Sequence, residues 1–312
     1  MHFDEQYVLV EPSFLTKSIP SPRWTSFPQK EHFFGEYKTS YHHHYFRSSF
    51  FQPFWSRDIK RSMQWRVNRP IHSSAISIDL PSTHYRKDVT VIVGEKLAYF
   101  AALAYGDGYA AYGEVRIVTA NSIFRDALED LVIMVAQEQN ATYRVSEKAS
   151  AITTNPKWEV VLNSTTVRRA FFDEQMRPKY DSIHSIALSE ELAVDFQAGL
   201  TDAEGSLLAE KPIDSPHGRI FAASNSDKRL LGIARLSLVY RLRLEPTSVR
   251  IRLGSKKGRT HEMRGVELVT RRNNYVIEIL SGAKRKWLER VGLRLRHPVK
   301  RAIAEQLLET YG

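Results

Sequence analysis

The sequence predicts an α+β fold in which one unit of elements, helix–strand–helix–strand–helix, occurs twice. Two apolar segments end on a carboxylate followed by glycine: FAALAYGDG at residues 100–108 and QAGLTDAEG at residues 197–205. Segments of alternating apolar and polar residues, typical of strands, follow each of them. In each half an Asn-Ser pair then precedes a helical pattern. Such self-similarity indicates an internal duplication.

The chain is expected to comprise three segments. Residues 1–72 carry several prolines and no sustained periodicity, which indicates a flexible extension. Its stretch YHHHYFRSSFFQPFW is rich in histidine but has no acidic residue to complete a metal site, so none is expected there. Residues 73–186 contain the first repeat, preceded by one or two strands, and residues 187–312 contain the second.

The first repeat is predicted to begin with a helix over residues 95–108. The strand pattern YGEVRIVT follows, and Asn121 is then expected to cap a helix whose apolar residues recur at helical spacing. The segments ATYRVSEK and KWEVVLN alternate as strands do. Ser164 precedes the last helix of this repeat, STTVRRAFFDEQM.

The second repeat is predicted to follow the same plan. The helix ELAVDFQAGLTDAEG leads to strand patterns in GSLLAEK and GRIFAAS, and Asn225 is expected to start the next helix as Asn121 does. VRIRLG and NYVIEIL are predicted strands, and SGAKRKWLERVG is a predicted helix. A further helix, HPVKRAIAEQLLETYG, completes the predicted elements.

Small residues give the helix before each carboxylate one smooth side. Positions four apart lie on the same side of a helix, so Ala102 and Gly106 form such a stripe in the first repeat, and Gly199 and Ala203 form one in the second. Stripes of this kind let two helices cross with their backbones almost in contact. We therefore expect these four residues to form the interface between the repeats.

Asp107 and Glu204 are expected at the C-terminal ends of these two helices, each followed by a glycine suited to a left-handed helix cap. A carboxylate there meets the negative end of the helix dipole, at a cost of up to about 1 kcal/mol. Two such acids would also repel each other where the helices cross. A divalent cation offsets both costs, and Mg²⁺ prefers a few carboxylates together with water and phosphate oxygens. The pair therefore suits metal-assisted hydrolysis of phosphodiesters.

The second segment, QAGLTDAEG, is similar to the LAGLIDADG motif of homing endonucleases, with Glu204 in the place of the motif's catalytic acid. The residues that match the motif are Ala198, Gly199, Leu200, Asp202, Ala203 and Gly205. FAALAYGDG is a weaker copy, which keeps Asp107 and has Ala102 where the first glycine is usual. Two motifs in one chain resemble the monomeric members of the family, and the tail HPVKR resembles tails of archaeal members.

The resemblance implies a saddle of two αββαββα repeats whose antiparallel sheets lie on the major groove of double-stranded DNA. Arginines on strands would then read base edges, and basic loops would hold phosphates. The expected DNA-binding residues are Arg116, Arg144, Lys148, Arg219, Arg250, Arg252, Lys256, Lys257 and Arg259. The resemblance also implies Asp107 and Glu204 as catalytic and metal-binding residues, Mg²⁺ as the cofactor, and Lys211 as the basic residue beside the scissile phosphate.

The net charge of +10 favours a polyanionic partner. Residues 191–312 carry 23 basic and 14 acidic side chains, so the positive charge lies mainly in the second repeat. The absence of cysteine excludes disulfides and thiolate metal sites. No apolar run approaches the ~20 residues that span a bilayer, so we expect no membrane association and a location in a prokaryotic cytoplasm or an organellar matrix.

Three functions stay open on the sequence alone. The first is a site-specific, intron-encoded endonuclease that cuts double-stranded DNA. The second is an RNA maturase of the same fold, for which the basic and aromatic extension leaves room as a contact with intron RNA. The third is a DNA-binding protein that has lost catalysis. The presence of both Asp107 and Glu204 favours an active enzyme over the third possibility.

Overall fold

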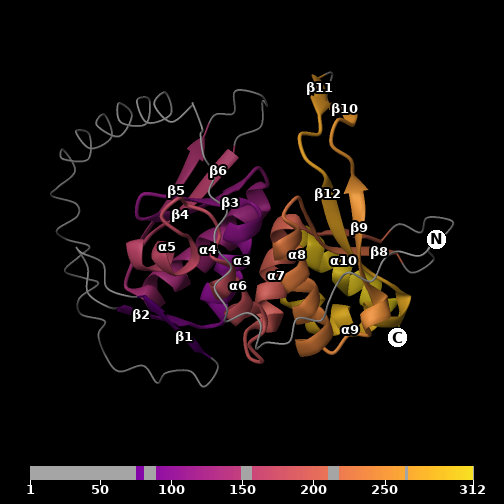
Figure 1. Ribbon diagram of the computed structural model, residues 1–312, viewed down its shortest axis with the longest axis horizontal. Coiled ribbons are helices and arrows are strands. Elements are labelled where there is room, and N and C mark those ends of the chain that lie inside the picture. The colour runs from indigo at the N-terminus through magenta and orange to yellow at the C-terminus, as the bar shows by residue number, and fades with distance from the viewer. Residues whose placement is uncertain (1–74, 81–88, 149–156, 210–217, 264–265, 312) are drawn as a thin grey trace, which may run out of the picture. The chain divides into compact units, whose positions relative to one another are not determined.

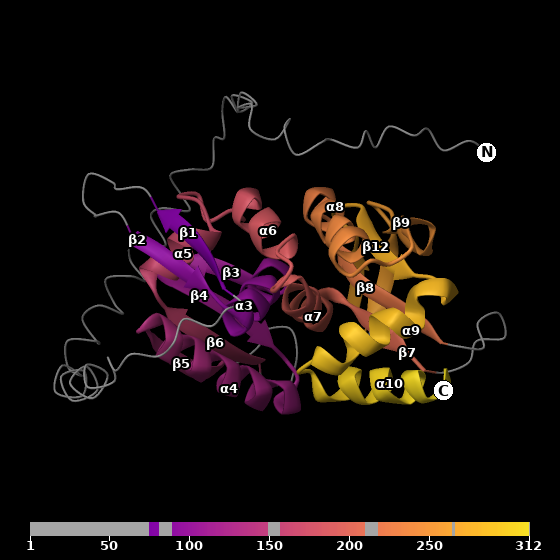
Figure 2. The ribbon, with the colours of Figure 1, turned by 90° about the horizontal axis from the view of Figure 1, so that it is seen from below.

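Helices α3 (Glu95–Gly106) and α7 (Ala193–Glu204) lie side by side in the computed structural model, and each leads into its own four-stranded antiparallel sheet (Figures 1 and 2). The structure describes residues 75–80, 89–148, 157–209, 218–263 and 266–311, which all belong to the compact unit Arg69–Gly312. The class is α+β, as predicted. The whole predicted extension, residues 1–72, and Lys211 lie outside the described residues.

The first half consists of a strand pair followed by seven further elements in the order helix, strand, strand, helix, strand, strand, helix. They are β1 (Ile76–Leu80), β2 (Val89–Val93), α3, β3 (Gly108–Ala111), β4 (Glu114–Thr119), α4 (Ser122–Gln139), β5 (Thr142–Lys148), β6 (Lys157–Asn163) and α5 (Thr165–Phe171). The helix α6 (Tyr180–Ala187), which the sequence patterns did not predict, connects this half to the second.

The second half repeats the order and adds a hairpin and a terminal helix. Its elements are α7, β7 (Ser206–Leu208), β8 (Arg219–Asn225), α8 (Lys228–Leu236), a π-helical turn (Ser237–Arg241), a 3₁₀ turn (Pro246–Ser248), β9 (Val249–Ser255), β10 (Thr260–Met263), β11 (Val266–Val269), β12 (Asn274–Ile279), α9 (Ser281–Arg290), a 3₁₀ turn (Gly292–Arg294) and α10 (Pro298–Glu309).

The two four-stranded sheets have the same strand order. One runs β3-β4-β6-β5 and the other β7-β8-β12-β9. In each sheet, the strand that comes last in the chain therefore lies between the second and the third. The hairpin β10–β11 is inserted between β9 and β12 and was not predicted. Figure 1 shows it continuing beyond the ends of these two strands.

Helix α3 is covered on every side, and its sequence explains why. Residues 97–105 are all apolar or aromatic and all buried, the pattern of a helix without a solvent side. It packs against α7, α4 and its own sheet. Among the described residues, no helix has the length and apolarity needed to cross a membrane.

The predicted helix starts are confirmed in the first half and corrected in the second. Asn121 accepts hydrogen bonds from the backbone N–H groups of Ile123 and Phe124, both at 3.0 Å. The cap of α8, however, is Asp227 and not Asn225. Strand β8 continues through Asn225, because this residue pairs with Tyr275 of β12.

Candidate functional site

The small residues of α3 and α7 meet as the sequence predicts. A Cβ atom built on Gly199 would lie 2.3 Å from the backbone oxygen of Tyr99 and 3.1 Å from Cβ of Ala102. One built on Gly106 would lie 2.5 Å from Cβ of Ala203. The contacts advance in the same direction along both helices, so α3 and α7 cross in parallel and their C-terminal ends lie together.

This crossing brings the two predicted acids to one place. Helix α3 ends at Gly106, with Asp107 as its cap, and α7 ends at Glu204. The carboxyl carbon of Glu204 lies 3.7 Å from a Cβ position on Gly106, the residue next to Asp107. The side-chain amide of Asn225 donates a hydrogen bond of 2.7 Å to Oε1 of Glu204 and so orients this carboxylate.

Burial shifts the pKa of both acids. Burial, followed by the negative charge of Asp107, raises the pKa of Glu204 to about 7, although Asn225 and Lys300 oppose the shift. Burial also raises the pKa of Asp107, again opposed by Lys300. Burial therefore destabilises the ionised form of both carboxylates, and a cation bound between them would offset this destabilisation.

The glycines after the acids do not form left-handed caps, which corrects the sequence prediction. Neither Gly108 nor Gly205 has a positive φ angle. Both are required by space: a Cβ on Gly205 would lie 2.6 Å from Cγ2 of Thr201, and one on Gly108 would lie 2.6 Å from the backbone oxygen of Arg116. Each glycine lets the chain turn directly from the helix into its sheet.

Lys300 lies at the end of α7, and the sequence patterns assigned it no role. Its Nζ donates hydrogen bonds to the backbone oxygens of Thr201, at 2.9 Å, and Asp202, at 2.7 Å. A cation at a helix C-terminus compensates the negative end of the dipole. The expectation that a metal alone would provide this compensation is therefore incomplete. The only sequence signal was the position of Lys300 inside the tail HPVKR.

Asp202 attaches this tail to the helix crossing. Its buried Oδ2 accepts hydrogen bonds from the hydroxyl of Tyr99 and from the backbone N–H groups of Arg296, at 2.7 Å, and His297, at 2.9 Å. The ring of His297 then packs 4.7 Å from that of Phe124, in the first half. The start of α10 therefore contacts both halves.

The donor set at the crossing fits one class of cation. Within the described ranges no three His, Asp or Glu residues gather as a metal cage. Mg²⁺ does not need such a cage, because it is commonly bound through one or two carboxylates together with water and substrate phosphates. Asp107 and Glu204, both penalised by desolvation and next to each other, meet that requirement.

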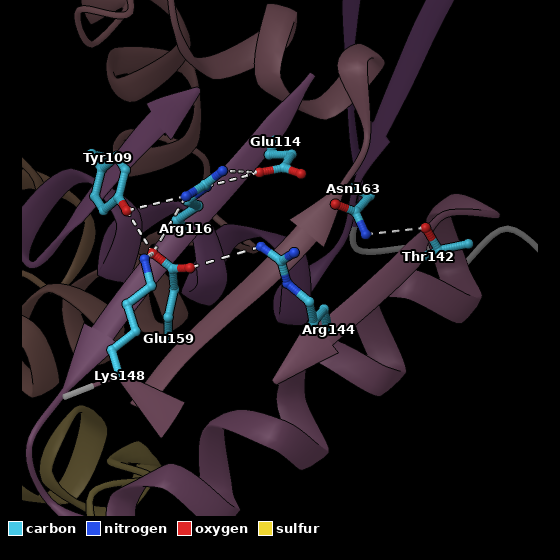
Figure 3. A network of polar contacts seen from close by, with 8 residues as sticks. All are labelled: Tyr109, Glu114, Arg116, Thr142, Arg144, Lys148, Glu159 and Asn163. Atoms are coloured by element: carbon cyan, nitrogen blue, oxygen red, sulfur yellow. Dashed lines mark hydrogen bonds and ion pairs between the residues drawn. The ribbon is translucent and has the colours of Figure 1, made fainter. Parts of the chain in front are cut away.

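The predicted DNA-binding residues of the first half gather around a single carboxylate (Figure 3). Lys148, Arg116 and Arg144 make ion pairs with the buried Glu159 on β6, at 2.6, 3.5 and 3.8 Å respectively. Their positive charges are therefore partly neutralised within the protein, which the sequence patterns did not reveal. The partners come from three different strands, β4, β5 and β6, so only the sheet pairing brings them together.

The second half has one restrained pair and one open basic loop. Arg250 and Arg252 both pair with Glu278 of β12, at 2.8 and 3.1 Å. Three further predicted residues, Lys256, Lys257 and Arg259, are exposed in the turn between β9 and β10, and make no ion pair with the described residues. The remaining one, Arg219, begins β8.

Neither a model of a known protein family nor a curated protein sequence matches this chain.

Proposed function

We propose that the chain is a Mg²⁺-dependent endonuclease for double-stranded DNA, with the two-repeat arrangement of the LAGLIDADG homing endonucleases. The observation that carries the proposal is the crossing of α3 and α7, which sets Asp107 beside Glu204. Two sheets of equal strand order follow these helices, each with basic side chains on its outer side. One chain then contains both acids, so the proposed enzyme acts as a monomer.

In this proposal each acid serves one DNA strand. Bound Mg²⁺ would supply an activated water and stabilise the leaving oxygen. Asp107 and Glu204 would hold the ion, and Asn225 would keep the carboxylate of Glu204 in one orientation. Lys300 would offset the negative end of α7, which favours the ionised form of both acids.

Cleavage of a plasmid library with randomised inserts would test the proposal. With Mg²⁺ we expect double-strand breaks whose sequenced ends share one long target, and with EDTA we expect none. Enrichment of a DNA sequence by binding, without breaks at any Mg²⁺ concentration, would favour a non-catalytic DNA-binding protein. Absence of DNA binding together with selective binding of a folded intron RNA would favour the maturase.

The basic turn between β9 and β10 is expected to hold phosphates. Replacing Lys256 and Lys257 by glutamine should flatten the dependence of log affinity on log salt concentration by up to about 1.8, because each lost phosphate contact accounts for about 0.9. Fluorescence anisotropy with a labelled duplex measures this slope. Lys96→Gln is the matched control, since Lys96 pairs with Glu138 at 2.6 Å on α3 and α4. An unchanged slope in the double variant would place the turn away from DNA.

A further inference from the structure

The carboxylate of Glu159 lies in an unusual position for a surface that is to contact DNA. Val160 and Leu162 of the same strand belong to the hydrophobic core. Because side chains alternate between the two sides of a strand, Glu159 points to the opposite, outer side of the sheet. There its side chain is only 1% exposed. Strand β6 is an interior strand of its sheet, and the polar side chains of both neighbouring strands cover Glu159 (Figure 3).

The groups around Glu159 leave it with more positive charge than it can neutralise. Lys148 donates to Oε1 at 2.6 Å and the hydroxyl of Tyr109 donates to the same oxygen at 2.5 Å. Oε2 is buried and accepts no hydrogen bond; among the described residues its ion-pair partner is Arg144, at 3.8 Å. Arg116 approaches at 3.5 Å and also pairs with Glu114. The network therefore restrains three cations by one buried carboxylate and one partly exposed one.

A phosphate and a base edge respond differently to this arrangement. A phosphate carries a full negative charge and would have to compete with Glu159 for its cations, close to a buried carboxylate that repels it. A base edge carries no net charge and offers hydrogen-bond acceptors to cations that are already oriented. The exposed turn with Lys256 and Lys257 has no such internal competitor among the described residues.

We infer that Glu159 is a specificity-determining residue, which retains Arg116, Arg144 and Lys148 against DNA phosphates and so weakens non-specific binding by the first sheet. This inference rests on the proposed binding of double-stranded DNA. It assigns different tasks to the two basic regions. The turn between β9 and β10 binds phosphates of DNA of any sequence. The first sheet binds tightly only to DNA whose base edges fit the restrained cations.

Glu159→Gln tests the inference with a duplex of arbitrary sequence and without a metal ion. The glutamine keeps the shape and the acceptor oxygen but loses the charge. We expect tighter binding at low salt and a salt slope steeper by about 0.9 for every cation that reaches a phosphate, up to about 2.7 for three. Damage to the sheet alone would lower affinity and would not steepen the slope. Unchanged or weaker binding by the folded variant would overturn the inference.

Lys148→Gln keeps the inference testable if Glu159→Gln does not fold. In the wild-type background it should leave the slope for non-specific duplex unchanged, because Lys148 is held by Glu159. In the Glu159→Gln background it should flatten the slope by about 0.9. A flatter slope for the single Lys148→Gln variant would overturn the inference. Glu114→Gln is the matched control. It removes one of the two carboxylates that pair with Arg116, and Glu159 still holds this arginine, so the effect on the slope should be smaller.

The same titrations separate the inference from the proposed function. If the wild-type protein binds no duplex at any salt concentration, both fail. If the wild type binds duplex with a salt-dependent affinity and Glu159→Gln reproduces its curve, only the inference fails.

Discussion

Replacing Glu204 by glutamine is expected to abolish DNA cleavage while DNA affinity is largely retained. The amide keeps the shape and can still contact Asn225, which donates to Oε1 of Glu204 at 2.7 Å. It loses the negative charge that would hold the metal. Loss of groups that merely support a metal ligand typically costs 10–100-fold, so loss of a ligand itself should leave less than about one hundredth of the wild-type rate. Single-turnover cleavage of the selected target, with anisotropy for binding, measures both quantities.

Asp107→Asn is expected to behave in the same way, because the two acids are proposed to hold the metal ion together. Gel analysis of supercoiled plasmid would show nicked rather than linear product for any activity that remains. Asp195→Asn is the matched control: this carboxyl, whose pKa burial raises to about 6, also lies on α7 but in its first turn. Wild-type cleavage of both strands by either active-site variant would show that the acid in question has no catalytic role.

The elements that the sequence predicted correctly are those whose signals are local. Apolar periodicity predicted α4, and the alternation of VRIRLG predicted a strand with Arg250 and Arg252 on one side, as their shared contact with Glu278 confirms. The stripes of α3 and α7 were also predictable, because four-residue spacing determines which residues share one side of a helix.

The features that sequence reasoning missed depend on contacts between distant segments. Asparagine is a residue type favoured at helix caps, but pairing with β12 keeps Asn225 in a strand and directs its amide to Glu204. Lys300 follows Glu204 by almost a hundred positions and Asp107 by almost two hundred, and the folding of the tail onto Asp202 brings it to α7. The alternation of β5 predicted the side of Arg144 and Lys148, but not that an acid of β6 lies between them.

Gly199 is expected to be the position in the helix crossing where an added side chain is most destabilising. A Cβ there would lie 2.3 Å from the backbone oxygen of Tyr99, a group that can move only with α3 itself. Gly199→Ala should therefore lower the free energy of unfolding by about 1–3 kcal/mol, the usual cost of overpacking, and Gly199→Leu by more. Separating the helices would also move Asp107 away from Glu204, so cleavage should fall further than the population of folded protein does.

Gly232→Ala provides the matched control, because Gly232 is also a helical glycine, but its Cβ position has no atom of the described residues within 4 Å other than the backbone of its own helix and its chain neighbours. Alanine in a helix interior is favoured over glycine by up to about 1 kcal/mol, so this variant should be as stable as the wild type or more so. Urea denaturation measures both variants, and cleavage under conditions where each remains folded separates geometry from stability. If Gly199→Ala is as stable and as active as Gly232→Ala, α3 and α7 do not cross at Gly199, and the adjacency of the two acids loses its structural basis.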